Sequence, residues 1–77
     1  MQIKVVLFSV FRDKLPPEKR GRTTIELPEG ATVRDALEKL DIHIHAIVAV
    51  NGEIERDWDT LLKEGDEIRV FRPIGGG

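Results

Sequence analysis

Apolar side chains alternate with polar ones, or recur at helical spacing, in five short stretches of the chain, and these stretches predict its elements. The first, QIKVVLFSVF, is rich in β-branched and aromatic residues and predicts a strand over residues 2–11. Successive side chains of a strand point to opposite faces. One face here carries Ile3, Val5 and Leu7, and the other carries Lys4, Val6, Phe8 and Val10. A strand that is apolar on both faces is usually central in its sheet or has one face covered by a partner.

Three later stretches predict the remaining strands. TTIEL, residues 23–27, alternates and is expected to form a hairpin with the first strand. AIVAV, residues 46–50, predicts a third strand, and the Asn51-Gly52 pair that follows is a strong signal for a tight turn. EIRVFR, residues 67–72, predicts the last strand. The segment before it is expected to be mostly connection, with core positions filled by Trp58, Leu61 and Leu62.

One stretch has helical spacing. In TVRDALEKL, residues 32–40, the apolar residues fall at i, i+3, i+4 and i+7 and form a single stripe of Val33, Ala36, Leu37 and Leu40. Thr32 is a good N-cap, and Asp35 three positions later completes a helix-start signal. A helix this short is not stable alone in water, so it must pack on the sheet.

The order of these elements is strand, strand, helix, strand, connection, strand, which predicts an α+β fold of the β-grasp type. One mixed sheet of four to five strands would wrap over one main helix, in a single domain that spans residues 1–77. The helix acts as a crossover, which allows the first and last strands to lie side by side and parallel. Residues 72–77 are expected to leave the sheet as an extended, flexible tail.

The segment between the first two strands, residues 12–22, is charged and contains Pro16, Pro17 and Gly21. It is therefore expected to be a surface loop. Its basic residues Lys19, Arg20 and Arg22 could suggest a phosphate site. Loops are where exposed charge accumulates, and we interpret these residues as solvated.

Composition and charge exclude several functions. The net charge is −2, from 12 basic and 14 acidic residues, so no basic excess exists to neutralise a nucleic-acid backbone. No apolar run is long enough to span a membrane, and the N-terminus lacks the features of a signal peptide, which predicts a cytoplasmic protein. The chain contains no cysteine, which excludes disulfides, cysteine–zinc sites and a thiol nucleophile.

Two polar clusters contain residue types that could carry chemistry. Asp41, His43 and His45 suggest metal binding, but zinc needs three or four ligands and no third soft ligand is evident, so no metal is expected.

The second cluster is an acidic stretch formed by Glu53, Glu55, Asp57 and Asp59. Paired carboxylates can act in acid–base catalysis. In a turn-rich segment a solvated face is the better interpretation, and no bound cofactor is expected.

Val6, Phe8 and Phe71 predict a binding surface. If the first and last strands are adjacent and parallel, these three side chains lie together on the sheet face opposite the helix. An exposed group of this kind on a small domain favours a protein interface. The alternative is that the loop of residues 12–22 folds over it.

The chain ends in VFRPIGGG, and Gly75, Gly76 and Gly77 have no side chains to bury. Such an end is either a frayed terminus or a functional one. A bare backbone can enter a narrow channel where any Cβ would clash, and it would present the terminal carboxylate to the active site of another protein. The neighbouring apolar face would supply the binding energy that ordering a tail requires.

Taken together, the pieces resemble the ubiquitin-like sulfur carriers, which include the small subunit of molybdopterin synthase (MoaD) and the thiamine-pathway carrier (ThiS). The matching pieces are IKVVLFSVFRDKL, LPEGATVRDALEKL, VAVNGE, LLKEGDEIRVF and the glycine terminus. Their order and spacing over the whole chain carry the resemblance. The long first strand that runs into a charged loop is more similar to the molybdopterin type.

The resemblance implies a mechanism and a set of partners. A ubiquitin-activating-like adenylyltransferase would use ATP to adenylate the carboxylate of Gly77. A persulfide donor protein would then convert the acyl adenylate to a thiocarboxylate. A synthase large subunit or a thiazole synthase would take the sulfur, so the chain would be a cosubstrate and not an enzyme.

Individual positions carry over from the same resemblance. Gly76 and Gly77 match the reactive pair, Gly75 stands where the family has a small residue, and Phe71 matches the interface aromatic. Arg72 replaces a proline of the molybdopterin type. The expected partner-binding segment is completed by Pro73 and Ile74.

The resemblance leaves the end use open. Molybdopterin or tungsten-pterin synthesis is the first expectation, followed by thiamine thiazole synthesis and tRNA thiolation. A ubiquitin-like modifier, joined through Gly77 to lysines of other proteins, would use the same activation step. A regulatory binding module with an inert tail is a further alternative, which the glycine end disfavours.

Overall fold

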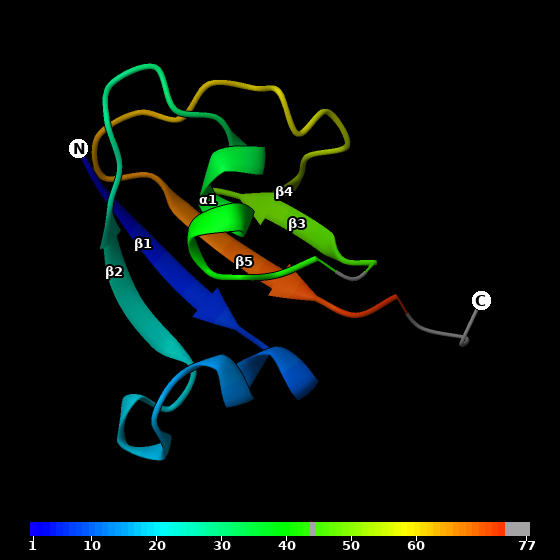
Figure 1. Ribbon diagram of the computed structural model, residues 1–77. Helices are drawn as coiled ribbons and strands as arrows, with labels where there is room; N and C mark the ends of the chain where they lie inside the picture. The colour runs from blue at the N-terminus through cyan, green and yellow to red at the C-terminus, as the bar shows by residue number, and fades with distance from the viewer. Residues whose placement is uncertain (44, 74–77) are drawn as a thin grey trace.

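The strands and the helix form where the alternating and helical patterns place them. The computed structural model describes residues 1–43 and 45–73. In the labels of Figure 1, its strands are β1 (Gln2–Leu7), β2 (Arg22–Glu26), β3 (Ile47–Val50), β4 (Glu53–Ile54) and β5 (Glu67–Phe71). The α-helix α1 is Val33–Lys39, and two 3₁₀ helices, η1 (Ser9–Lys14) and η2 (Pro17–Lys19), lie between β1 and β2.

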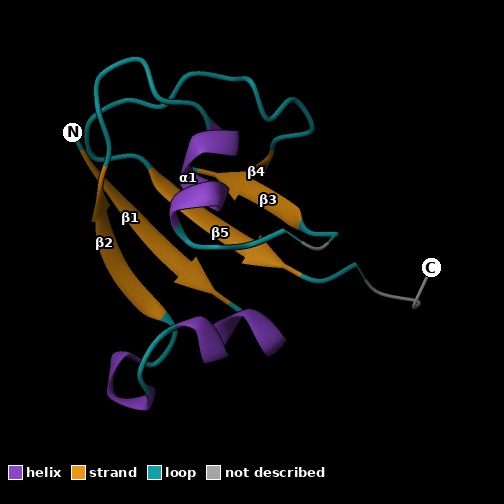
Figure 2. Cartoon of the chain, viewed as in Figure 1, coloured by secondary structure: helices purple, strands orange, loops and turns teal. Residues whose placement is uncertain are grey.

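The five strands form one mixed sheet in the order β2-β1-β5-β3-β4. β1 pairs antiparallel with β2 and parallel with β5, and β3 pairs antiparallel with both β5 and β4. Figure 2 shows α1 lying across one face of this sheet. The predicted β-grasp fold, with the first and last strands side by side and parallel, is confirmed.

The core lies between α1 and the sheet. Val33, Ala36 and Leu37 of the helix stripe are buried, and Ile68 and Val70 of β5 are fully covered beneath them. A capping box fixes the start of α1, as predicted. The Thr32 hydroxyl accepts a hydrogen bond from the Asp35 backbone N–H at 3.2 Å, and the Asp35 carboxylate accepts one from the Thr32 N–H at 2.9 Å.

The first strand is shorter than the sequence predicts, and the loop after it is more ordered. β1 ends at Leu7 because Ser9 takes a left-handed conformation, with φ 55°, and turns the chain into η1. This turn carries Phe11 into the core, where 1% of it is exposed. The expected loop over residues 12–22 therefore contains the rest of η1 and all of η2.

The connection before β5 also differs from expectation. Leu61 was expected in the core but is 62% exposed, whereas Leu62 is buried. The reason is the bridge between Leu61 and Thr32, which makes this short stretch extended, so neighbouring side chains point in opposite directions. The predicted turn at Asn51-Gly52 is confirmed, with φ values of 51° and 88°, and it leads into β4, which the sequence did not reveal.

Candidate functional site

The sheet face opposite α1 carries a line of apolar side chains that ends beside the C-terminal segment. Phe8 follows β1, and its backbone N–H donates to the Val70 carbonyl at 3.1 Å, which extends the pairing with β5 by one step. The Phe8 and Phe71 rings then stack, with centroids 4.8 Å apart and 20° between the planes. Ile47 of β3 lies opposite Phe71 on the other side. The predicted proximity of Phe8 and Phe71 is confirmed.

A second row crosses the same face one step further from the C-terminal end of β5. The strand register places Val6 of β1 beside Arg69, Arg69 beside Ala49, and Ala49 beside Ile54. Opposite residues on paired strands share a face of the sheet. We call the set formed by Phe8, Phe71, Ile47, Ala49 and Ile54 the outer apolar strip.

The prediction that Val6 is exposed on this face is wrong. Val6 is only 6% exposed and Ala49 only 4%, although neither belongs to the core cluster under α1. Val6 lies between Arg22 and Arg69 in the register. Arginine covers apolar neighbours with its methylene groups, and the Arg69 Nε donates to Glu67 at 2.9 Å, back along the strand. Val6 therefore contributes little accessible surface to this face.

The remaining members of the outer apolar strip are accessible. Ile54 is 56% exposed, and Ile47, Phe8 and Phe71 are half-buried. Arg72, exposed, and Pro73, half-buried, continue from Phe71 outside the sheet. The other predicted site residues lie outside the described part of the structure: Ile74, Gly75, Gly76 and Gly77.

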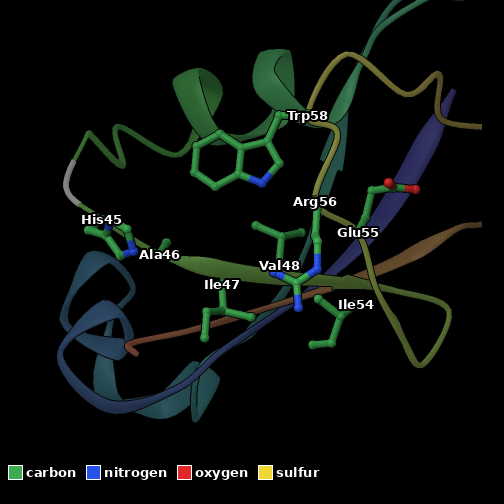
Figure 3. Close-up of a pocket in the computed structure, with 8 residues that line it drawn as sticks. All are labelled: His45, Ala46, Ile47, Val48, Ile54, Glu55, Arg56 and Trp58. Carbon is green, nitrogen blue, oxygen red and sulfur yellow. The ribbon is translucent and has the colours of Figure 1, made fainter. Parts of the chain in front are cut away.

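A hollow of about 220 Å³ adjoins the outer apolar strip at the β4 edge of the sheet. Figure 3 shows the Trp58 ring on the α1 side of this hollow, with Arg56 and Ile54 across from it. Ile47 and Ile54 belong both to the strip and to the wall of the hollow. The apolar surface therefore continues around the sheet edge toward Trp58.

The Asp41–His43 pair lies away from this face. The His43 Nε2 and Asp41 Oδ1 atoms are 2.7 Å apart, and the Lys14 Nζ is 3.8 Å from Asp41 Oδ2. The hydrogen bond from His43, followed by the charge of Lys14, lowers the pKa of Asp41 below its ordinary value of 3.8. His45 does not join them and lines the Trp58 hollow. Among residues 1–43 and 45–73, no group of three potential metal ligands occurs.

The acidic stretch after β4 organises its own backbone. The Asp57 N–H donates to the Glu55 carboxylate at 3.2 Å, and the Asp59 N–H donates to the Asp57 carboxylate at 3.0 Å. The Asp59 carboxylate also pairs with the Arg34 side chain of α1 at 3.1 Å. These carboxylates therefore shape a surface connection, which agrees with the interpretation made from the sequence.

Sequence reasoning missed three members of the outer apolar strip, Ile47, Ala49 and Ile54. Ile47 had a usable signal, because it alternates with Val48 and so falls on the face opposite the core. Ile54 had none, since β4 is only two residues long.

None of the helices in the described ranges is long and apolar enough to cross a membrane.

The fold and the apolar outer face define a class of protein, the small ubiquitin-like β-grasp domains. Within that class the chain belongs to the ThiS family, whose model matches residues 5–77. The family resemblance that the sequence pieces suggested is thereby confirmed.

Individual relatives agree with this assignment. The chain is 33% identical to a molybdopterin synthase sulfur carrier subunit from Chlamydomonas reinhardtii, with all of both chains covered. It is 36% identical to the protein RnfH of Neisseria gonorrhoeae, over 75% of this chain and 71% of that one. Among solved structures, molybdopterin converting factor subunit 1 from Pyrococcus furiosus is 33% identical, with a TM-score of 0.78 and 96% and 99% of the two chains covered.

Proposed function

We propose that this chain is a sulfur carrier that is used as a thiocarboxylate at Gly77, in molybdopterin or tungsten-pterin synthesis. The observation that carries the proposal is the family match over residues 5–77, which includes the glycine terminus. The 33% identity to a molybdopterin synthase sulfur carrier subunit over its whole length supports the pterin pathway. The chain has no cysteine, so a terminal carboxylate is the group on which it could carry sulfur.

The chemistry requires two partners before sulfur is delivered. On a ubiquitin-activating-like adenylyltransferase, a Gly77 carboxylate oxygen attacks the α-phosphorus of ATP, and pyrophosphate leaves. The terminal sulfur of a persulfide donor then attacks the acyl carbon, and AMP leaves with the electron pair of the broken C–O bond. A thiol of the donor cleaves the resulting acyl disulfide, so that a disulfide forms on the donor and the thiocarboxylate stays on Gly77. AMP is needed because a free carboxylate oxygen is a poor leaving group.

The outer apolar strip provides the binding energy for the synthase large subunit. Phe71 ends β5, and Gly77 is six residues further along the chain, so the terminus can reach at most about 20 Å beyond the sheet. Half-buried aromatic residues at the point where the C-terminal segment leaves the sheet are suited to anchor the carrier on its partner. The carrier is then a cosubstrate that performs no catalysis, and because its activation consumes ATP we place it in the cytoplasm.

Intact-mass spectrometry tests the proposal. The carrier is incubated with its adenylyltransferase, ATP and a persulfide donor, and we expect a gain equal to the mass difference between sulfur and oxygen, localised to Gly77. A variant that lacks Gly77 is the matched control and should gain nothing. Addition of the synthase large subunit and its pterin precursor should reverse the gain. An unchanged mass with partners that are active on another carrier would refute the proposal.

A further inference from the structure

A second surface, unrelated to the outer apolar strip, gathers positive charge at the end of the sheet where η1 and η2 lie (Figure 2). Residues 9–22 contain five basic and two acidic residues, a net charge of +3. The rest of the chain contains seven basic and twelve acidic residues, a net charge of −5. The molecule is therefore electrostatically polarised, and an anionic ligand would be attracted to this end.

Two arginines of this region converge on one hollow. A cavity of about 330 Å³ opens between η1 and η2, and both Arg12 and Arg20 line it. Ser9, Leu15 and Pro16 also line it. Within residues 1–43 and 45–73, neither Arg12 nor Arg20 has a carboxylate within ion-pair distance. Their guanidinium donors are therefore available to an anion from outside.

The backbone conformation around η2 brings these two residues to the same hollow. Arg20 takes a left-handed conformation, with φ 55°, at the end of η2, and its N–H donates to the Pro17 carbonyl at 3.1 Å. The Arg12 side chain lies directly over Gly21, because a Cβ built there would be 3.2 Å from both its Cγ and its Nε. A side chain at residue 21 would therefore crowd the Arg12 side chain.

We propose that Arg12 and Arg20 form a binding site for a phosphate monoester group. The planar guanidinium fork matches the oxygens of phosphate and can bind them with two parallel hydrogen bonds. The apolar wall of Leu15 and Pro16 can contact an organic group attached to the phosphate. Asp13, which also lines the hollow, opposes the anion and sets a limit on affinity. Of the basic cluster that the sequence suggested, Arg20 lines this hollow, whereas Lys19 and Arg22 do not.

The test is an NMR titration of the ¹⁵N-labelled carrier at about pH 7.5, where phosphate is largely dianionic. Inorganic phosphate and AMP are added in separate arms, and sodium chloride at matched ionic strength is the reference. We expect saturable shifts at the amides of Arg12, Arg20 and Gly21 with phosphate and with AMP, and none with chloride. With AMP alone, the shifts should extend to Leu15.

Variants separate a built site from general charge attraction. Arg12→Gln and Arg20→Gln should each weaken binding about tenfold, whereas Lys19→Gln, with the same charge change in the same segment, should weaken it less than about twofold. Asp13→Asn should tighten binding, a result that loss of folding cannot produce. Shifts that do not saturate, or an equal loss in Lys19→Gln, would overturn the proposal. Because none of these residues belongs to the outer apolar strip or the terminus, failure here would leave the sulfur-carrier proposal standing.

Discussion

Phe8 and Phe71, 63 positions apart in the sequence, stack with ring centroids 4.8 Å apart on the outer face of the sheet. The parallel pairing of β1 with β5 creates this contact, since each ring follows or ends one of the two strands. The stack stands directly before the segment that leads to Gly77. The same two rings therefore contribute to the stability of the fold and form part of the surface that we propose binds the partner.

The stack predicts a coupling between the two rings. In a double-mutant cycle of Phe8→Ala and Phe71→Ala, the free energy of unfolding should show an interaction of about 0.5–1.5 kcal/mol. Urea denaturation of the four proteins measures it. Thr24 is exposed on β2, so a cycle of Phe71→Ala with Thr24→Ala serves as the control and should be additive. Additivity in the Phe8 cycle would show that the stack contributes no pairwise energy.

Phe71 should contribute more to partner binding than to the stability of the fold. Phe71→Ala should weaken the complex with the synthase large subunit by about 1–4 kcal/mol if Phe71 is a buried anchor of the interface. Isothermal titration calorimetry measures the affinity. Ile54→Ala, at the far end of the outer apolar strip, should cost less, and Thr24→Ala should cost nothing measurable. An unaltered affinity for Phe71→Ala would place the interface on another face.

The secondary structure was largely predictable because its signals are local. Alternation gives the main strands, the apolar stripe gives α1, and Thr32 with Asp35 gives its start. The pattern does not predict where β1 ends. Serine has no strong preference for the left-handed conformation that Ser9 adopts there. The residues after it, Val10 and Phe11, keep a strand-like composition although they lie in η1.

The functional surfaces were only partly predictable, because they depend on neighbours from distant strands. Phe8 and Phe71 could be paired once parallel strands were assumed. The burial of Val6 depends on Arg22 and Arg69, which the register places on either side of it. The hollow between η1 and η2 depends on the conformations of Arg20 and Gly21, and the sequence shows only that basic residues are near one another.

The Asp41–His43 pair gives a prediction about acid. The hydrogen bond from His43 lowers the pKa of Asp41, so its titration midpoint, measured by carboxyl ¹³C NMR, should lie below 3.8. Because the folded-state pKa is depressed, the pair stabilises the fold above about pH 4 and loses this contribution as pH falls through the folded-state value. His43→Gln should raise the midpoint toward 3.8. Lys14→Gln should raise it less, since the Lys14 charge is the smaller cause. A midpoint unmoved by His43→Gln would contradict this assignment.

Adding one methyl group at Gly21 should lower the free energy of unfolding more than adding one at Gly30. Gly21 has a φ of 75°, and an added Cβ would lie 2.5 Å from the Leu7 carbonyl oxygen. Gly21→Ala should therefore lose the 1–2 kcal/mol expected for a left-handed alanine, plus the cost of moving β1 or the chain after η2, for a total above about 2 kcal/mol. Gly30→Ala is the matched control, because Gly30 has a φ of 87° but open space around its Cα. It should lose only the conformational part. Urea denaturation compares the two, and equal losses would show that the Leu7 contact relaxes without cost.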